Sequence, residues 1–409
     1  MKAVVFSKNK KVEVKDVKIP EIEDSREAIV QVTSAAICGS DLHMYDGRTN
    51  MEKGHIFGHE IMGIVDSVGE GVTQLRVGDR VVLPFNISCG TCINCAKGVT
   101  SGCLTTNPEG VGAAYGYAGM GPHEGGQAEF VRVPFADFNC LKVPGEPWDK
   151  FEDDFLMLAD IFPTGYHACE LANVQPGKSV VIFGAGPVGL LAAHSAFIRG
   201  ASQVFVVDPS KERLKIAKKF GAETIHFSDG PIAKQIQEIR KKNKLLTGSL
   251  RPGEEKLLKG VDCGIDAVGF QATLPSGEKS DPTNVLCQLI ELVNPGGHIG
   301  VVGVYTEKDP GAKKPQHSKG IFELPLGDIF SKALTIATGQ TPVKKYNVLL
   351  RDLILSGIAK PHEIVSDHIK IDDAPAYYEK FDLRGHGKGK DCTKVIIQMK
   401  KNFKKRKAA

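Results

Sequence analysis

The sequence predicts an α/β protein of two domains, an all-β domain followed by a doubly wound parallel sheet. Its 409 residues are too many for one ordinary hydrophobic core. Across residues 1–140, short apolar runs alternate with Gly, Pro and Asp turns at close spacing, which indicates strands. From about residue 165 to residue 335, strand patterns alternate with helix patterns. This alternation implies a parallel sheet with right-handed crossovers.

The elements are expected in the following order. Strands of the first domain cover residues 28–32, 61–65 and 80–83. The second domain begins with strands over 180–183 and 203–207, helices over 211–220 and 233–242, and a strand over 261–268. Asp281 and Pro282 predict the start of a helix with Pro at its first position, and a strand over 298–304 follows. A helix over 348–355 and a strand over 393–398 are expected to return to the first domain.

The composition is that of a soluble globular protein without a membrane segment. Apolar residues make up 42% and charged residues 24% of the chain, and no apolar run could span a bilayer. The first six residues lead straight into strand-like sequence and do not form a signal peptide, so we expect a cytoplasmic protein. A net charge of +4 is too small to imply a nucleic-acid partner, and residues 400–407 are expected to be a solvated basic tail.

A glycine-rich turn joins the first strand and helix of the second domain. The strand over 180–183 precedes Gly184, Gly186 and Gly189, and the next strand ends on Asp208. Gly184 permits a tight turn, Gly186 lets the backbone approach a pyrophosphate, and Gly189 lets helix and strand pack closely. Asp208 would accept hydrogen bonds from ribose hydroxyls, and the helix N-terminus would bind phosphate. The pattern predicts a dinucleotide-binding (Rossmann) unit, the alternative being an ordinary glycine turn.

Four cysteines lie within fifteen residues of the first domain, at positions 89, 92, 95 and 103. Ten cysteines in a chain without an export signal favour metal sites or free thiols over disulfides. Four thiolates close a tetrahedral shell around Zn²⁺, so Cys89, Cys92, Cys95 and Cys103 predict a structural zinc site. A zinc ribbon that binds nucleic acid is the competing interpretation. It is disfavoured because Lys97 is the only charge within the loop.

A second group of potential ligands is dispersed along the first domain. Cys38, Ser40, Asp41 and His43 follow one strand-like run, and His59 with Glu60 adjoins another. A cysteine and a histidine are two of the three protein ligands that an open catalytic zinc site needs. A lone buried Cys or His is usually part of a core. The local density of these residues and the dinucleotide unit downstream favour the catalytic interpretation.

The motif Gly58-His59-Glu60-x2-Gly63-x5-Gly69 resembles the signature of zinc-dependent medium-chain alcohol dehydrogenases. The Cys38 motif, the four cysteines and the glycine turn appear in that family's order, so the resemblance covers essentially the whole chain. It implies a GroES-like catalytic domain over 1–164, an NAD-binding Rossmann domain over 165–335, and a return to the catalytic domain over 336–409. Within the family, the chain is most similar to glutathione-independent formaldehyde dehydrogenases, over residues 103–108, 114–117, 125–129, 160–167 and 338–347.

The resemblance also implies roles for individual residues. Cys38, His59 and Asp160 would bind a catalytic zinc, which with the four-cysteine site gives two Zn²⁺ per chain. Glu60 and Asp41 would orient the ligands. Ser40 and His43 would form a proton path. The expected NAD-binding residues are Gly39, Ser40, His43, Gly184, Gly186, Val188, Gly189, Asp208, Arg213, Val268, Val302, Val304, Gly339 and Thr341.

The expected activity is oxidation of formaldehyde, as its hydrate, or of a similar small aldehyde or alcohol by NAD without glutathione. The same resemblance implies a homo-oligomer, a dimer or a tetramer. An alcohol or polyol dehydrogenase is the nearest alternative, and a non-catalytic zinc- and nucleotide-binding protein is the third. Two long connections, 270–280 and 306–320, are expected to cover the cofactor and slow its release, with aldehyde dismutation as a consequence. Thr273 and Pro275 depart from the basic residues that the resemblance leads us to expect.

Overall fold

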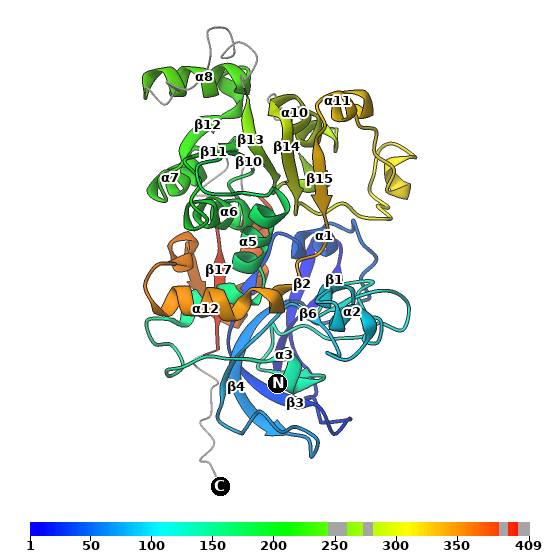
Figure 1. Cartoon of the computed structure of the whole chain (residues 1–409). Helices are drawn as coiled ribbons and strands as arrows, with labels where there is room; N and C mark the ends of the chain where they lie inside the picture. The colour runs from blue at the N-terminus through cyan, green and yellow to red at the C-terminus, as the bar shows by residue number, and fades with distance from the viewer. Residues whose placement is uncertain (244–259, 273–280, 384–391, 400–409) are drawn as a thin grey trace.

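The computed structural model describes residues 1–243, 260–272, 281–383 and 392–399. Figure 1 shows two bodies, with the helices α6 (Pro187–Ile198), α7 (Lys211–Lys219) and α8 (Ile232–Lys242) in the upper one. The lower body holds the N-terminal strands, coloured blue. The orange and red C-terminal segment, up to β17 (Val395–Gln398), runs back beside those strands and belongs to the lower body.

A seven-stranded sheet forms the centre of the lower body, in the order β16-β17-β3-β4-β5-β9, with β8 paired to β3. β3 (Ala28–Ile37) is buried along its whole length and pairs antiparallel with β4 (Glu60–Val68). β17 (Val395–Gln398) pairs antiparallel with β3 on the other side, so the end of the chain completes this sheet. The other strands are β5 (Arg80–Leu83), β8 (Phe130–Val133), β9 (Leu141–Lys142) and β16 (Asp367–Ile369).

Residues 1–140 also contain two short antiparallel strand pairs and three short helices. β1 (Lys2–Lys8) pairs with β2 (Lys11–Asp16), and β6 (Asn86–Ile87) pairs with β7 (Ala113–Ala114). The helices are α1 (Asp41–Tyr45), α2 (Ile93–Ala96) and α3 (Ala136–Asn139). Our all-β interpretation of residues 1–140 omitted them, because four or five residues are too few to show a helical period.

The upper body is built on a six-stranded parallel sheet in the order β12-β11-β10-β13-β14-β15. The order reverses at β10, and ligands of such sheets bind beyond the carboxyl ends of the strands at this point. The strands are β10 (Ser179–Phe183), β11 (Gln203–Asp208), β12 (Glu223–His226), β13 (Val261–Asp266), β14 (Val293–Val301) and β15 (Thr335–Thr338).

Helices cover both faces of this sheet, which confirms the doubly wound fold. Val180 and Ile182 of β10 belong to the core that α5 (Ile161–Leu171), α6 and α7 cover. Val181 and Phe183 face the opposite core, with α8 and α10 (Asn284–Leu292). Successive side chains of a strand point to opposite faces, so a strand that is apolar throughout needs two covering layers.

Some predicted element boundaries were wrong. α10 begins at Asn284 instead of Pro282, because the Asp281 carboxylate accepts hydrogen bonds from the backbone N–H and hydroxyl of Thr283, the residue that caps the helix. β13 ends at Asp266, and β14 begins at Val293 and ends at Val301. In the described part of the chain, none of the helices combines the length and apolar character that a bilayer crossing requires.

Candidate active site

Three element ends bring together the donor atoms of the first candidate metal site. Cys38 follows β3, His59 precedes β4, and Asp160 precedes α5. Ligand atoms of these three residues and of Glu60 all lie within 4.8 Å of one another. Asp160 Oδ2 lies 4.0 Å from Cys38 Sγ and 3.4 Å from His59 Nε2. A thiolate, an imidazole and a carboxylate can hold zinc with a fourth position open, so the donor set fits the expected metal.

Asp41 fixes the orientation of the His59 ring. Its Oδ1 lies 3.2 Å from His59 Nδ1, which leaves Nε2 facing Asp160. Its Oδ2 accepts hydrogen bonds from the Cys38 backbone N–H at 2.9 Å and from the Gln127 amide at 3.3 Å. Burial lowers the pKa of His59, but the charges of Asp41 and Cys38 outweigh burial and raise it well above its ordinary value. The same charges would favour a metal ion at Nε2 in place of a proton.

Asp160 is held in a comparable way. The Thr164 hydroxyl donates to its Oδ1 at 2.7 Å, so Oδ2 is left to face Cys38 and His59. Burial raises the pKa of Asp160, but contacts with His59 and Thr164 lower it below its ordinary value. The side chain is therefore kept as a carboxylate, the form in which it can bind a metal.

Glu60 lies behind His59 in a fully buried ion pair that the sequence did not predict. Its Oε2 pairs with Lys394 Nζ, and neither side chain is exposed to solvent. Lys394 also donates to the Ile37 carbonyl at 3.2 Å. Burial raises the pKa of Glu60 in spite of the lysine, whereas the Glu60 charge keeps the pKa of buried Lys394 above its ordinary value. A lysine beside the apolar run of β17 was the sequence signal for this pair.

The four cysteines form a separate cluster, with ligand atoms within 4.8 Å of one another. Cys92 Sγ lies 3.9 Å from Cys103 Sγ, and the backbone N–H groups of Cys89 and Cys92 donate to sulfur at 3.3 Å. Burial raises the pKa of Cys89, but hydrogen bonds from Thr105 and Thr91 bring it down to about 5. Burial raises the pKa of Cys95 to about 12, so thiolate is favoured at Cys89 and not throughout the cluster. Four converging sulfurs fit a closed zinc site.

The glycine turn takes the geometry that the sequence predicts. Gly184 has a φ of +95°, a conformation that favours glycine. A Cβ on Gly189 would lie 1.8 Å from the Gly184 carbonyl, so only glycine fits there. Gly186 caps α6, with Pro187 at its first position. Asp208, at the end of β11, accepts hydrogen bonds from the Ala185 N–H at 2.7 Å and the Ser210 N–H at 2.8 Å.

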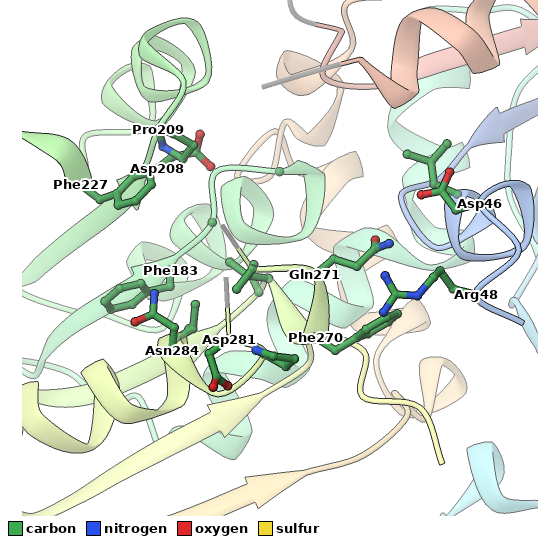
Figure 2. Close-up of a pocket in the computed structure, with 18 of the residues that line it drawn as sticks. Asp46, Arg48, Phe183, Asp208, Pro209, Phe227, Phe270, Gln271, Asp281 and Asn284 are labelled. Carbon is green, nitrogen blue, oxygen red and sulfur yellow. The ribbon is translucent and has the colours of Figure 1, made fainter. Parts of the chain in front are cut away.

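Two cavities lie beyond the carboxyl ends of the parallel strands. The larger, about 970 Å³, is lined by Gly184, Asp208 and Arg213 together with Arg48 and Phe270. Figure 2 shows Asp208 on one side of it and Arg48 beside Phe270 on another. The smaller cavity, about 200 Å³, shares Gly186 and Val268 with the larger one. Its other predicted lining residues are Cys38, Gly39, Ser40, His43, His59, Asp160, Val188, Val302, Val304, Gly339 and Thr341.

Ser40 and His43 border the smaller cavity from α1 and the residue before it. Ser40 Oγ lies 3.2 Å from His59 Nε2, and the His43 ring packs against Phe270 with 4.9 Å between centroids.

Gly189 and Glu60 border neither cavity. The sequence missed the aromatic and thioether side chains of the smaller cavity, Phe85, Tyr117 and Met120. Tyr117 lies in one of the stretches that carry the family resemblance.

The segment 306–320 spans the larger cavity and contacts the other domain. The Arg48 guanidinium makes a two-point ion pair with Asp309, with Nε 2.6 Å from Oδ1. The same guanidinium lies 4.8 Å from the centre of the Phe270 ring. Lys314 pairs with Asp281 at 3.0 Å, which ties the segment to its own domain. Residues 273–280 of the other predicted cover, including Thr273 and Pro275, lie outside the described residues, as does the basic tail, residues 400–407.

Comparisons with known proteins agree with this arrangement. A family model for the alcohol dehydrogenase GroES-like domain matches residues 24–145, and one for zinc-binding dehydrogenases matches 187–341. The glutathione-independent formaldehyde dehydrogenase of Pseudomonas aeruginosa is 41% identical over 93% of this chain and 94% of its own. The formaldehyde dismutase of Pseudomonas putida is 38% identical over 93% of this chain and 94% of its own. An alcohol dehydrogenase structure from Thermus sp. ATN1 is 33% identical, covers 97% of this chain and 99% of its own, and has a TM-score of 0.79.

Proposed function

Because the chain belongs to the zinc-type alcohol dehydrogenase family and is an oxidoreductase, we propose that it oxidises formaldehyde, as its hydrate, with NAD. The observation that carries the proposal is the Cys38, His59 and Asp160 donor set at the wall of a small cavity that opens into the dinucleotide groove. The product is the carboxylic acid, and no glutathione is needed.

Zinc bound by Cys38, His59 and Asp160 would supply a Lewis acid that lowers the pKa of the substrate hydroxyl. The chain itself must accept the proton that leaves this hydroxyl. Ser40 is the first acceptor, since its hydroxyl borders the smaller cavity and lies 3.2 Å from His59 Nε2. His43, which borders the same cavity, is the second, because an imidazole can accept and release a proton. Bound NAD would supply the hydride acceptor that oxidation of the hydrate requires.

The size of the smaller cavity supports a small substrate. About 200 Å³ has to hold both the nicotinamide end of the cofactor and the substrate. Phe85, Tyr117 and Met120 add bulky side chains to the lining of this cavity, and the rings of Phe85 and Tyr117 lie beside His59. A one-carbon hydrate fits the remaining space better than a polyol does, which favours the aldehyde over the nearest alternative, an alcohol or polyol dehydrogenase.

We also propose slow cofactor release with dismutation of part of the aldehyde. The segment 306–320 is tied to the other domain through Arg48 and Asp309 across the larger cavity. NADH that stays bound can return its hydride to a second aldehyde, so one aldehyde becomes acid and the other becomes alcohol. The similarity to the formaldehyde dismutase of Pseudomonas putida supports this proposal of dismutation.

The test is to denature the purified protein, identify any nucleotide released, and assay formaldehyde with and without added NAD⁺ and glutathione. We expect acid formation that does not depend on glutathione. Turnover of polyols with no turnover of formaldehyde would favour the alternative. Absence of turnover with any alcohol or aldehyde in the presence of NAD⁺ would favour a non-catalytic binding protein and refute the proposal.

A further inference from the structure

The chain crosses from the upper body to the lower one through a short segment that also borders the smaller cavity. β15 ends at Thr338, and Gly339, Gln340 and Thr341 then line the cavity. A 3₁₀ turn, Val343–Lys345, follows and leads to α12 (Asn347–Leu355). We refer to residues 339–345 as the crossing segment. Its backbone forms part of the wall that the nicotinamide end of a bound dinucleotide would meet.

Asn86 holds this segment from two sides. It lies in β6 and is fully buried. Its side-chain Nδ2 donates to the Thr341 backbone carbonyl at 2.6 Å. Lys344 Nζ donates to the backbone carbonyl of Asn86 at 2.7 Å and lies 3.5 Å from the side-chain Oδ1. The Thr341 carbonyl requires a donor and Lys344 Nζ donates, so these neighbours place Asn86 Nδ2 toward Thr341 and Oδ1 toward Lys344. Burial lowers the pKa of Lys344 to about 7, and its amine can donate a hydrogen bond in either protonation state.

Apolar packing surrounds these polar contacts. Val343 is fully buried against Phe85 and Ala114, and both of these residues border the smaller cavity. Lys344 Nζ lies 5.6 Å from the centre of the Phe138 ring. Asn86 itself and Lys344 border neither cavity. Any effect of these two residues on a bound cofactor must therefore act through the crossing segment.

We propose that Asn86 and Lys344 are positioning residues that clamp the crossing segment and so fix the cofactor-facing backbone of residues 339–341. The proposal rests on the proposed use of NAD. Asn86 stands three residues before Cys89, so the clamp anchors the cavity wall at the base of the four-cysteine cluster. When the clamp is broken, the wall can withdraw from the nicotinamide, and the cofactor dissociates faster without any change in the donor set of Cys38, His59 and Asp160.

The test compares NADH dissociation from the holoenzyme and its variants, followed by loss of NADH fluorescence after a chase with excess NAD⁺. Asn86→Asp replaces the donor to Thr341 by a carboxylate oxygen and keeps an acceptor for Lys344. We expect dissociation to be faster by on the order of tenfold, the effect of losing one buried hydrogen bond. Lys344→Met should give a similar change, and Lys344→Arg should restore slow release.

Lys345→Met is the matched control. It removes a neighbouring lysine of the same 3₁₀ turn, whose ion pair with Glu170 lies on the exposed side, and it should leave NADH dissociation unchanged. Zinc content should stay equal in all variants. If Asn86→Asp does not fold, the difference in the rate of NADH dissociation between Lys344→Met and Lys344→Arg tests the clamp. Unchanged dissociation from folded variants would overturn the clamp, whereas a wild-type protein that binds no NADH would overturn the proposed function itself.

Discussion

At the scale of single residues, we predict that Asp208 selects the dinucleotide that binds. Its carboxylate is held in place by the N–H groups of Ala185 and Ser210, so it cannot easily turn away from a ribose phosphate. Arg213 is the nearby cation, and its guanidinium already lies 3.4 Å from Asp208. We expect kcat/KM to be higher with NAD⁺ than with NADP⁺ by on the order of a hundredfold, because facing like charges cost several kcal/mol. Asp208→Ser should narrow this gap, and equal or better kcat/KM with NADP⁺ would contradict the assignment.

The buried pair of Glu60 and Lys394 gives a second prediction at this scale. Lys394→Met would leave the Glu60 carboxylate without its partner in a site with no access to solvent. Breaking one side of a buried pair costs about 3–5 kcal/mol in the free energy of unfolding. Urea denaturation should show this loss for Lys394→Met and a smaller loss for the double variant Glu60→Gln/Lys394→Met. Equal losses in the two would mean that the ion pair itself contributes little.

At the scale of elements, the two metal sites should respond differently to loss of a ligand. Cys92 belongs to a closed cluster on a loop with little secondary structure, so Cys92→Ser should mainly lower thermal stability. Cys38 follows the fully buried strand β3, so Cys38→Ser should mainly abolish turnover and leave the fold intact. Metal analysis should give two zinc ions per wild-type chain and about one in each variant. A result of one zinc per wild-type chain would mean that one of the two candidate sites binds no zinc.

The elements also show what the sequence can and cannot predict. Gly184 and Gly189 predicted the turn between β10 and α6 because each meets a local steric requirement, a positive φ at Gly184 and a close backbone contact at Gly189. The predicted start of α10 was wrong because Asp281 accepts hydrogen bonds from Thr283, so the helix begins after Thr283 and not at Pro282. The contacts of Lys394 with Glu60 and of Lys344 with Asn86 join residues more than 250 positions apart. The sequence can mark one member of such a pair, as it does for the lysine beside β17, but the partner becomes visible only when the sheets assemble.

At the scale of the whole molecule, the two bodies are joined across the larger cavity by Arg48 and Asp309. Asp309 is 4% exposed, and the cation is also packed over Phe270. We propose that this ion pair has to open before a bound dinucleotide can leave the larger cavity. We therefore expect the purified protein to keep its nucleotide through desalting and to convert formaldehyde into both acid and alcohol without net formation of NADH.

Arg48→Met tests this expectation, since it removes the ion pair to Asp309 and retains apolar contact with Phe270. The variant should lose nucleotide on desalting, depend on added NAD⁺, and yield more acid than alcohol. Arg26→Met is the control, because Arg26 likewise pairs with a carboxylate, Asp24, and lies over a ring, that of Phe135, but borders neither cavity. Absorbance spectra and product analysis give the readouts. Wild-type protein that emerges free of nucleotide and makes acid but no alcohol would show that the segment 306–320 does not retain the cofactor.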